Sequence, residues 1–176
     1  QYLKDIEKYE SGDIEPCQAT FYVGSQEESR VPRAFADDYI RTQKSVAWVG
    51  HNIWQLGDRL EKVFGLRYIG RASGVDFRES EILYEGRIFK RRPSLGPQIE
   101  LLPVDVQKFE VLAGIRAWRS REVIPYAIRS KNRFYLTDLP PVEVFHREQE
   151  SIFVDLLPEI IGSLPRGRAT KISQAR

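Results

Sequence analysis

Basic and aromatic side chains interleave in three segments of this sequence, at 87–92, at 116–121 and at 129–135. The guanidinium group of arginine pairs with phosphates and stacks on rings, and aromatic rings stack on nucleic-acid bases. On a β-hairpin, alternate residues share a face, so basic residues at every second position lie on the same side. We therefore predict nucleic-acid contact by five residues: Arg91, Arg92, Arg129, Lys131 and Arg133.

The same arginines have a purely structural interpretation. Acidic residues that are able to pair with them across strands occur at Glu79, Glu81, Glu85 and Glu122. Such cross-strand pairs of opposite charge stabilise a sheet. The formal net charge of the chain is only +2, so the protein as a whole does not attract nucleic acid over long distances. Whether the arginines are exposed or paired decides between the two interpretations.

Two short segments resemble the second half of the GIY-YIG nuclease signature. The first is Phe21-Tyr22-Val23-Gly24 followed by Arg30 and Arg33, and the second is Arg67-Tyr68-Ile69-Gly70 followed by Arg71 and Arg78. The resemblance implies metal-assisted phosphodiester cleavage that uses Tyr68, Arg71, Arg78 and a nearby glutamate. Each match covers four residues, and no GIY-like strand precedes either one at a suitable distance. A small nuclease, or another phosphodiester-acting enzyme, is therefore the alternative to a non-enzymatic function.

Other common sets of catalytic or metal-binding residues are missing from the sequence. Two histidines, His51 and His146, and the single Cys17 are too few for a zinc site made only of Cys and His. Cys17 has no glycine-rich elbow around it, and a lone cysteine is more often a small core residue than a nucleophile. The chain has no G-x-S-x-G, P-loop or G-x-G-x-x-G motif. We therefore predict no catalytic residue, no metal site and no cofactor.

A long amphipathic helix is the strongest local prediction. A spacing that alternates between four and three residues, typical of a helix seam, relates Phe35, Tyr39, Thr42, Val46, Val49, Ile53, Leu56, Leu60 and Val63. Pro32 suits a first helical turn, and Gly65 supplies a stop. The helix would run for about 30 residues, roughly 45 Å. A break at Gly50 or Gly57 is the alternative, since each glycine costs up to about 1 kcal/mol relative to alanine.

The predicted helix is also the predicted contact surface. An apolar stripe of roughly 45 Å is long for one compact domain to cover, and Trp54 widens it. We therefore predict a homo-oligomer or a protein partner that contacts Val49, Ile53, Trp54, Leu56 and Leu60. The alternative is that the helix packs across the hairpins of its own chain.

The remaining elements complete a predicted α+β fold. Strands are expected at 18–23 and 66–69, hairpins at 77–84 with 87–91 and at 122–128 with 133–137, and helices at 104–118 and 148–164. The predicted architecture is one long amphipathic helix with a C-terminal helix packed on antiparallel hairpins. Residues 1–164 form a single domain, and the basic stretch 165–176 is expected to be a disordered tail.

Composition narrows the class of protein. Hydrophobic residues make up 41% of the chain and charged residues 30%, and no apolar run is long enough to span a bilayer. The first residues do not form a signal peptide, and the absence of methionine indicates a segment of a longer protein. A single cysteine fits a reducing compartment, so we predict an intracellular, cytoplasmic location without membrane contact.

These observations favour a non-enzymatic interaction module of a macromolecular assembly. The module would self-associate or dock through the long helix, and its arginine-rich hairpins would contact nucleic acid as an additional candidate partner.

Overall fold

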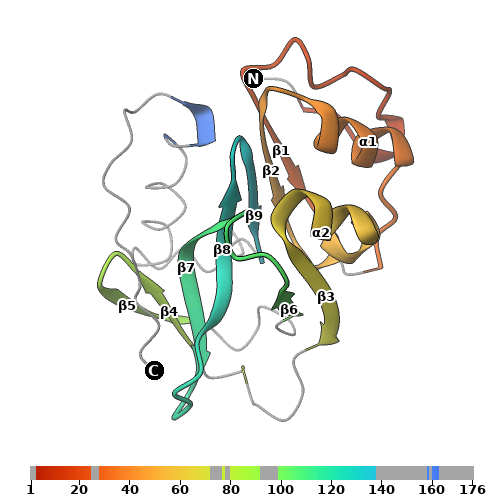
Figure 1. Ribbon diagram of the computed structural model, residues 1–176. Helices are drawn as coiled ribbons and strands as arrows, with labels where there is room; N and C mark the ends of the chain where they lie inside the picture. Colours follow the sequence, from red (N-terminus) through yellow and green to blue (C-terminus); the bar gives the residue numbers. More distant parts are fainter. Residues whose placement is uncertain are drawn as a thin grey trace.

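The computed structural model describes residues 3–24, 28–71, 77, 80–91, 99–137, 158 and 160–162, and it does not describe the side chain of Arg91. Within these ranges, strands dominate and the helices are short (Figure 1). The strands form one mixed sheet of seven strands and a second sheet of two strands. The predicted α+β fold with one long helix is therefore wrong.

The large sheet has a parallel part and an antiparallel part. Its strand order is β1-β2-β9-β8-β7-β4-β5. The parallel strands are β1 (Ala19–Val23), β2 (Ser45–Val49) and β9 (Arg133–Leu136). The antiparallel strands that follow are β8 (Ile124–Ser130), β7 (Glu110–Ala117), β4 (Ser80–Tyr84) and β5 (Arg87–Arg91). The carboxyl ends of β1, β2 and β9 therefore meet at one edge of the sheet.

The segment that was predicted as one long helix consists of several elements. It forms α1 (Arg33–Arg41), strand β2, the 3₁₀-helix η2 (His51–Leu56) and α2 (Asp58–Phe64). The chain turns at Gly50 (φ 130°) and at Gly57 (φ 54°), which are conformations that glycine adopts far more readily than other residues. The chain does turn at both glycines, but α1 already ends at Arg41 and residues 45–49 form a strand, so the alternative of one helix broken at a glycine is also wrong.

The buried run in β2 explains why the helical pattern failed. Val46, Ala47, Trp48 and Val49 are all buried, whereas an amphipathic helix would expose part of such a run. A parallel strand inside a sheet is covered on both faces and has a continuous apolar sequence. The spacing of Val46 and Val49 fits a helix seam by coincidence.

Both faces of the large sheet are covered by apolar clusters. One cluster packs Trp48 against Tyr22, Phe35 and Tyr39, and it includes side chains from α1, η2 and α2. Figure 1 shows α1 and α2 together on this side of the sheet. The second cluster lies on the opposite face and includes Ile160, which is fully buried.

Local turns were predicted better than the helices. The hairpin β4–β5 turns at Glu85-Gly86, and the hairpin β8–β9 turns at Lys131-Asn132, as predicted. The short strand at 66–69 is confirmed as β3 (Leu66–Arg71), which pairs with β6 (Ile99–Pro103). The predicted helix at 104–118 is wrong, because residues 110–117 form β7 between β8 and β4.

The predicted C-terminal elements are only partly described. Pro158, Ile160 and Ile161 have helical backbone, and the rest of the predicted helix at 148–164 lies outside the described residues. The basic stretch at 165–176 also lies outside them. Within the described ranges, no helix combines the length and the apolar composition that are needed to span a membrane.

Candidate functional site

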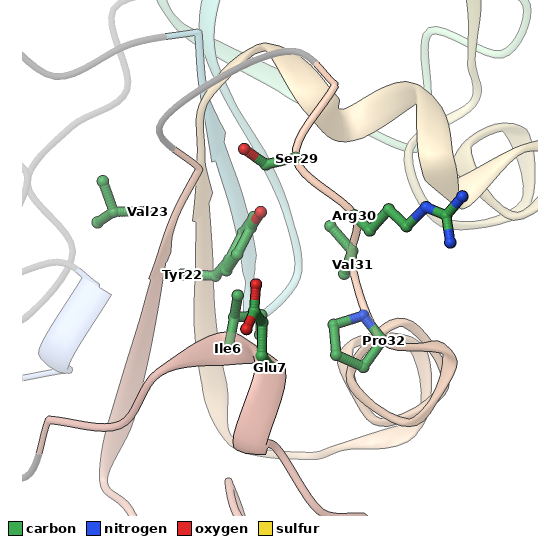
Figure 2. A pocket seen from close by; sticks show the side chains of 8 residues that line it. All are labelled: Ile6, Glu7, Tyr22, Val23, Ser29, Arg30, Val31 and Pro32. Carbon is green, nitrogen blue, oxygen red and sulfur yellow. The ribbon is translucent and has the colours of Figure 1, made fainter.

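A pocket of about 600 Å³ opens at the carboxyl end of β1 (Figure 2). One wall is the 3₁₀-helix η1 (Ile6–Lys8), and the facing wall is the segment 29–32 that leads into α1. The lining residues are Ile6, Glu7, Tyr22, Val23, Ser29, Arg30, Val31 and Pro32. In open sheets with parallel strands and helices, ligands bind outside the carboxyl ends of the strands. The pocket lies at this kind of position.

Two glycines let the ends of β1 and β2 approach closely. Gly24 follows β1 and Gly50 follows β2, and the Gly24 amide donates to the Val49 carbonyl at 2.7 Å. A Cβ at Gly50 would lie 2.7 Å from the Gly24 carbonyl oxygen, and a Cβ at Gly24 would lie 2.5 Å from the Asn52 Oδ1 atom. The backbone of β1 and the side chain of Asn52 are therefore packed without room for another carbon atom.

Asn52 connects the pocket to the core through three hydrogen bonds. The Trp48 Nε1–H donates to Asn52 Oδ1 at 3.1 Å. The Asn52 Nδ2 group donates to the Ser29 carbonyl at 3.0 Å and to the Tyr22 hydroxyl oxygen. Because an indole N–H is only a donor, the amide oxygen of Asn52 must face Trp48 and its nitrogen must face the pocket. The donor-only indole of Trp48 thus fixes the orientation of this fully buried amide.

Gln55 fixes the wall of the pocket from the same 3₁₀-helix. Its Nε2 donates to the Ser29 carbonyl at 2.6 Å, and its Oε1 accepts from the Val31 amide at 2.9 Å. Together with Asn52, it holds the backbone of the segment before α1. The wall is therefore formed before any ligand arrives, which lowers the entropic cost of binding.

The polar groups of the pocket differ in charge and burial. Tyr22 is only 5% exposed, and its burial raises the pKa of its hydroxyl above the ordinary value, with the hydrogen bond from Asn52 opposing the rise. The hydroxyl therefore keeps its proton at neutral pH. Glu7 and Arg30 are exposed, and neither forms an ion pair with another residue that the structure describes.

The predicted partner-binding residues do not form a surface. Val49, Ile53, Leu56 and Leu60 are buried in the protein's own core, and only Trp54 is partly accessible, with 40% exposure. The predicted helix seam is therefore not a docking surface, because its residues are divided between a strand and two short helices that pack inward.

Two of the five predicted nucleic-acid-binding residues, Arg129 and Arg133, are held by other groups of the protein. Arg129 pairs with Glu110 at 2.6 Å. Arg133 donates to the backbone carbonyls of Tyr39 at 2.8 Å, of Thr42 at 3.0 Å and of Ile40, so it caps the carboxyl end of α1. Lys131 lies exposed in the β8–β9 turn.

The other two members of the predicted set cannot be placed on a surface. The side chain of Arg91 and the whole of Arg92 lie outside the described residues. The structural interpretation gains further support from the Arg116–Glu81 pair, at 2.6 Å between β7 and β4. Cross-strand pairing therefore explains the presence of Arg116 and Arg129.

The structure describes only part of the set that the nuclease resemblance implies. Tyr68 packs against the core, Arg71 is exposed on β3, and Arg78 lies outside the described residues. In the described part of the chain, no group of three or more His, Cys, Asp or Glu side chains is placed to hold a metal ion. Tyr22 and Arg30 from the other segment do line the pocket.

Sequence reasoning missed Glu7, Ser29 and Asn52. One signal was present: the aromatic-Val-Gly pattern occurs twice, as Tyr22-Val23-Gly24 and as Trp48-Val49-Gly50. In the sheet these two triplets are neighbours in register, with Tyr22 opposite Trp48. A repeated strand end of this kind indicates two parallel strands that finish at one edge.

No protein-family model matches this chain, and no curated protein and no solved structure matches it.

Proposed function

We propose that this chain is a small-molecule-binding domain that holds its ligand in the pocket at the carboxyl end of β1. The observation that carries the proposal is the buried Tyr22 hydroxyl in the pocket, fixed by Asn52 while the facing wall is fixed by Asn52 and Gln55. A concave site with apolar walls and a few fixed polar groups is typical of ligand pockets. Here the apolar walls are formed by Ile6, Val31 and Pro32.

Filling the pocket is expected to abolish ligand binding without unfolding the chain. Ser29 lines the pocket, and Figure 2 shows its side chain pointing into the space between the segment before α1 and β1. Ser29→Trp therefore places bulk in the site and keeps the backbone carbonyl to which Asn52 and Gln55 donate. In a thermal-shift screen of small polar compounds, a ligand at 100 times its Kd should add about 2.7 kcal/mol, or roughly 5–10 °C. We expect this shift in the wild-type chain and none in Ser29→Trp.

The matched control for this experiment is Ile88→Trp on β5. Ile88 is 56% exposed, and it does not belong to the pocket lining. This variant adds the same indole group away from the site and should keep the full ligand-induced shift. Shifts that persist in Ser29→Trp, or a screen in which no compound stabilises the chain, would contradict the proposed function.

A second candidate function is association with another copy of the chain. Four exposed apolar residues lie on or directly after the two-stranded sheet: Ile69, Leu102, Val104 and Val106. Clusters of exposed apolar side chains on soluble domains often mark protein contacts. This candidate keeps the predicted self-association but transfers it from the helix seam to the β3–β6 sheet.

Charge at the β3–β6 sheet is expected to prevent such self-association. In light scattering at high protein concentration, the wild-type chain should have twice the mass of a single chain. The double variant Leu102→Glu, Val106→Glu should have the mass of one chain, because buried carboxylates without partners oppose association. Ile88→Glu on β5 is the control and should remain associated. A wild-type chain that is monomeric at every concentration removes this candidate.

Nucleic-acid binding and phosphodiester cleavage stay predictions with less support. The ion pair of Arg129 and the capping role of Arg133 leave Lys131 as the exposed member of the described set. The intracellular, cytoplasmic location also stays a prediction, based on the single cysteine.

A further inference from the structure

The hydroxyl of Tyr22 has a defined role in the pocket. Its oxygen accepts a hydrogen bond from Asn52 Nδ2, and the donor-only indole of Trp48 prevents the amide from turning round. The Tyr22 proton is therefore not used in the bond to Asn52 and is directed elsewhere. The ligand atom beside Tyr22 should be an acceptor oxygen, because a donor group of the ligand would face the proton of the Tyr22 hydroxyl.

Two opposite charges stand on the two walls of the same pocket. Glu7 projects from η1, and Arg30 belongs to the facing segment before α1 (Figure 2). Each is exposed, and neither has an ion-pair partner among the residues that the structure describes. In Figure 2 the Arg30 side chain extends away from Tyr22, so Arg30 contributes positive charge at the rim while Tyr22 provides the direct donor.

These groups define the kind of ligand that complements the pocket. A purely anionic ligand would be repelled by Glu7, and a purely cationic ligand would leave the Tyr22 donor and the charge of Arg30 unmatched. A small zwitterion satisfies all three groups. The apolar side chains of Ile6, Val31 and Pro32 leave room for an aliphatic portion beside the charged groups.

We propose that the pocket binds a small zwitterion with an aliphatic portion, such as a free amino acid. The ammonium group pairs with Glu7, and the carboxylate accepts from Tyr22 and lies in the field of Arg30. This inference rests on the proposed function, since it names the ligand class of the same pocket.

Three related compounds test the need for both charges by isothermal titration calorimetry. L-Leucine has both charged groups, isoamylamine is leucine without the carboxylate, and isocaproate is leucine without the ammonium group. Because a hydrogen bond to a charged group contributes substantially to affinity, we expect leucine to bind at least about tenfold more tightly than either analogue. Equal affinities for the three compounds would overturn the zwitterion proposal.

Two variants assign the two ends of the ligand. Tyr22→Phe should weaken leucine binding about tenfold and leave isoamylamine unchanged, because it removes only the donor to the carboxylate. Glu7→Gln should weaken leucine and isoamylamine but not isocaproate, and its exposed position makes folding insensitive to the change. Glu15→Gln, also exposed but outside the pocket lining, is the control.

The outcomes separate this inference from the proposed function. If none of the three compounds binds, but other compounds stabilise the wild-type chain and not Ser29→Trp, the pocket is a binding site and the zwitterion class is wrong. If leucine binds equally well to Ser29→Trp, both proposals are wrong. If leucine affinity is unchanged in both Tyr22→Phe and Glu7→Gln, the proposed arrangement of the ligand is wrong.

Discussion

The Gly50→Ala variant is expected to unfold with a free energy about 4 kcal/mol lower than that of the wild-type chain. Gly50 has φ 130° and ψ 168°, a region of backbone space that is essentially restricted to glycine. An added Cβ would also lie 2.7 Å from the carbonyl oxygen and 3.2 Å from the Cα atom of Gly24. Both neighbours are backbone atoms at the end of β1, so the clash cannot be relieved by rotating a side chain. Urea unfolding followed by tryptophan fluorescence measures the loss.

Gly70→Ala separates backbone strain from steric clash. Gly70 also has a positive φ of 147°, but an added Cβ would meet no described atom within 4 Å. This variant should lose only the cost of the unfavourable backbone conformation, about 1–3 kcal/mol. If both variants lose the same free energy, the close approach of β1 and β2 does not contribute to the stability of this edge of the sheet.

The prediction of a long helix was wrong for a reason that concerns the same edge of the sheet, where β1 and β2 end. A helix seam and a buried parallel strand both place apolar residues at positions 46 and 49, so spacing alone does not distinguish them. What distinguishes them is Ala47-Trp48, which lies between these positions and is as buried as its neighbours. Its burial depends on the two apolar clusters that cover opposite faces of β2, which is long-range information.

The hairpins were predictable because they depend on neighbouring residues. Asn132 occupies the β8–β9 turn, and its amide also donates to the Thr42 carbonyl at 3.3 Å and to that of Lys44. The first role follows from the turn preference of asparagine. The second joins positions that are 90 residues apart, and it requires β2 and β9 to be adjacent. Local turn chemistry is visible in a sequence, and such distant pairing is not.

The candidate site depends on distant pairing throughout. Its residues come from η1, from β1 and from the segment before α1, and its orientation comes from Asn52 in η2. The position of Arg133 also depends on distant pairing, although its basic character suggested a surface role. Its guanidinium caps α1 because β9 ends the parallel part of the sheet beside that helix. Residue type alone did not indicate this contact within the chain.

Asn52→Asp is expected to lower the free energy of unfolding by about 4 kcal/mol or more at pH 7. The change keeps the size and shape of the side chain and replaces the nitrogen that faces Tyr22 and Ser29 by an oxygen. The new carboxylate would be fully buried and would face the Ser29 carbonyl, which accepts hydrogen bonds and cannot donate one. An uncompensated buried charge of this kind is among the largest costs of a single substitution.

The cost of this substitution should depend on pH in a defined direction. Burial and the need to donate to Ser29 both favour the protonated carboxyl, so its pKa in the folded chain is raised above the unfolded value of about 3.9. The folded state then binds more protons than the unfolded state between these two pKa values, and the variant loses stability as pH rises through this interval. Relative to the wild-type chain, the deficit should be smallest near pH 4 and should grow by about 1.4 kcal/mol for each unit of pKa shift.

Asn52→Ala is the matched variant without a titratable group. It removes the acceptor for the Trp48 indole N–H and the donor for Tyr22 and Ser29, and it should cost about 3 kcal/mol at pH 4 and at pH 7 alike. Urea unfolding of the wild-type chain and both variants at the two pH values measures these differences. A deficit for Asn52→Asp that is equal at both pH values would mean that position 52 is neither buried nor required as a donor towards Ser29. The hydrogen bonds assigned to Asn52 would then be wrong, and with them the directed proton of Tyr22 on which the choice of ligand depends.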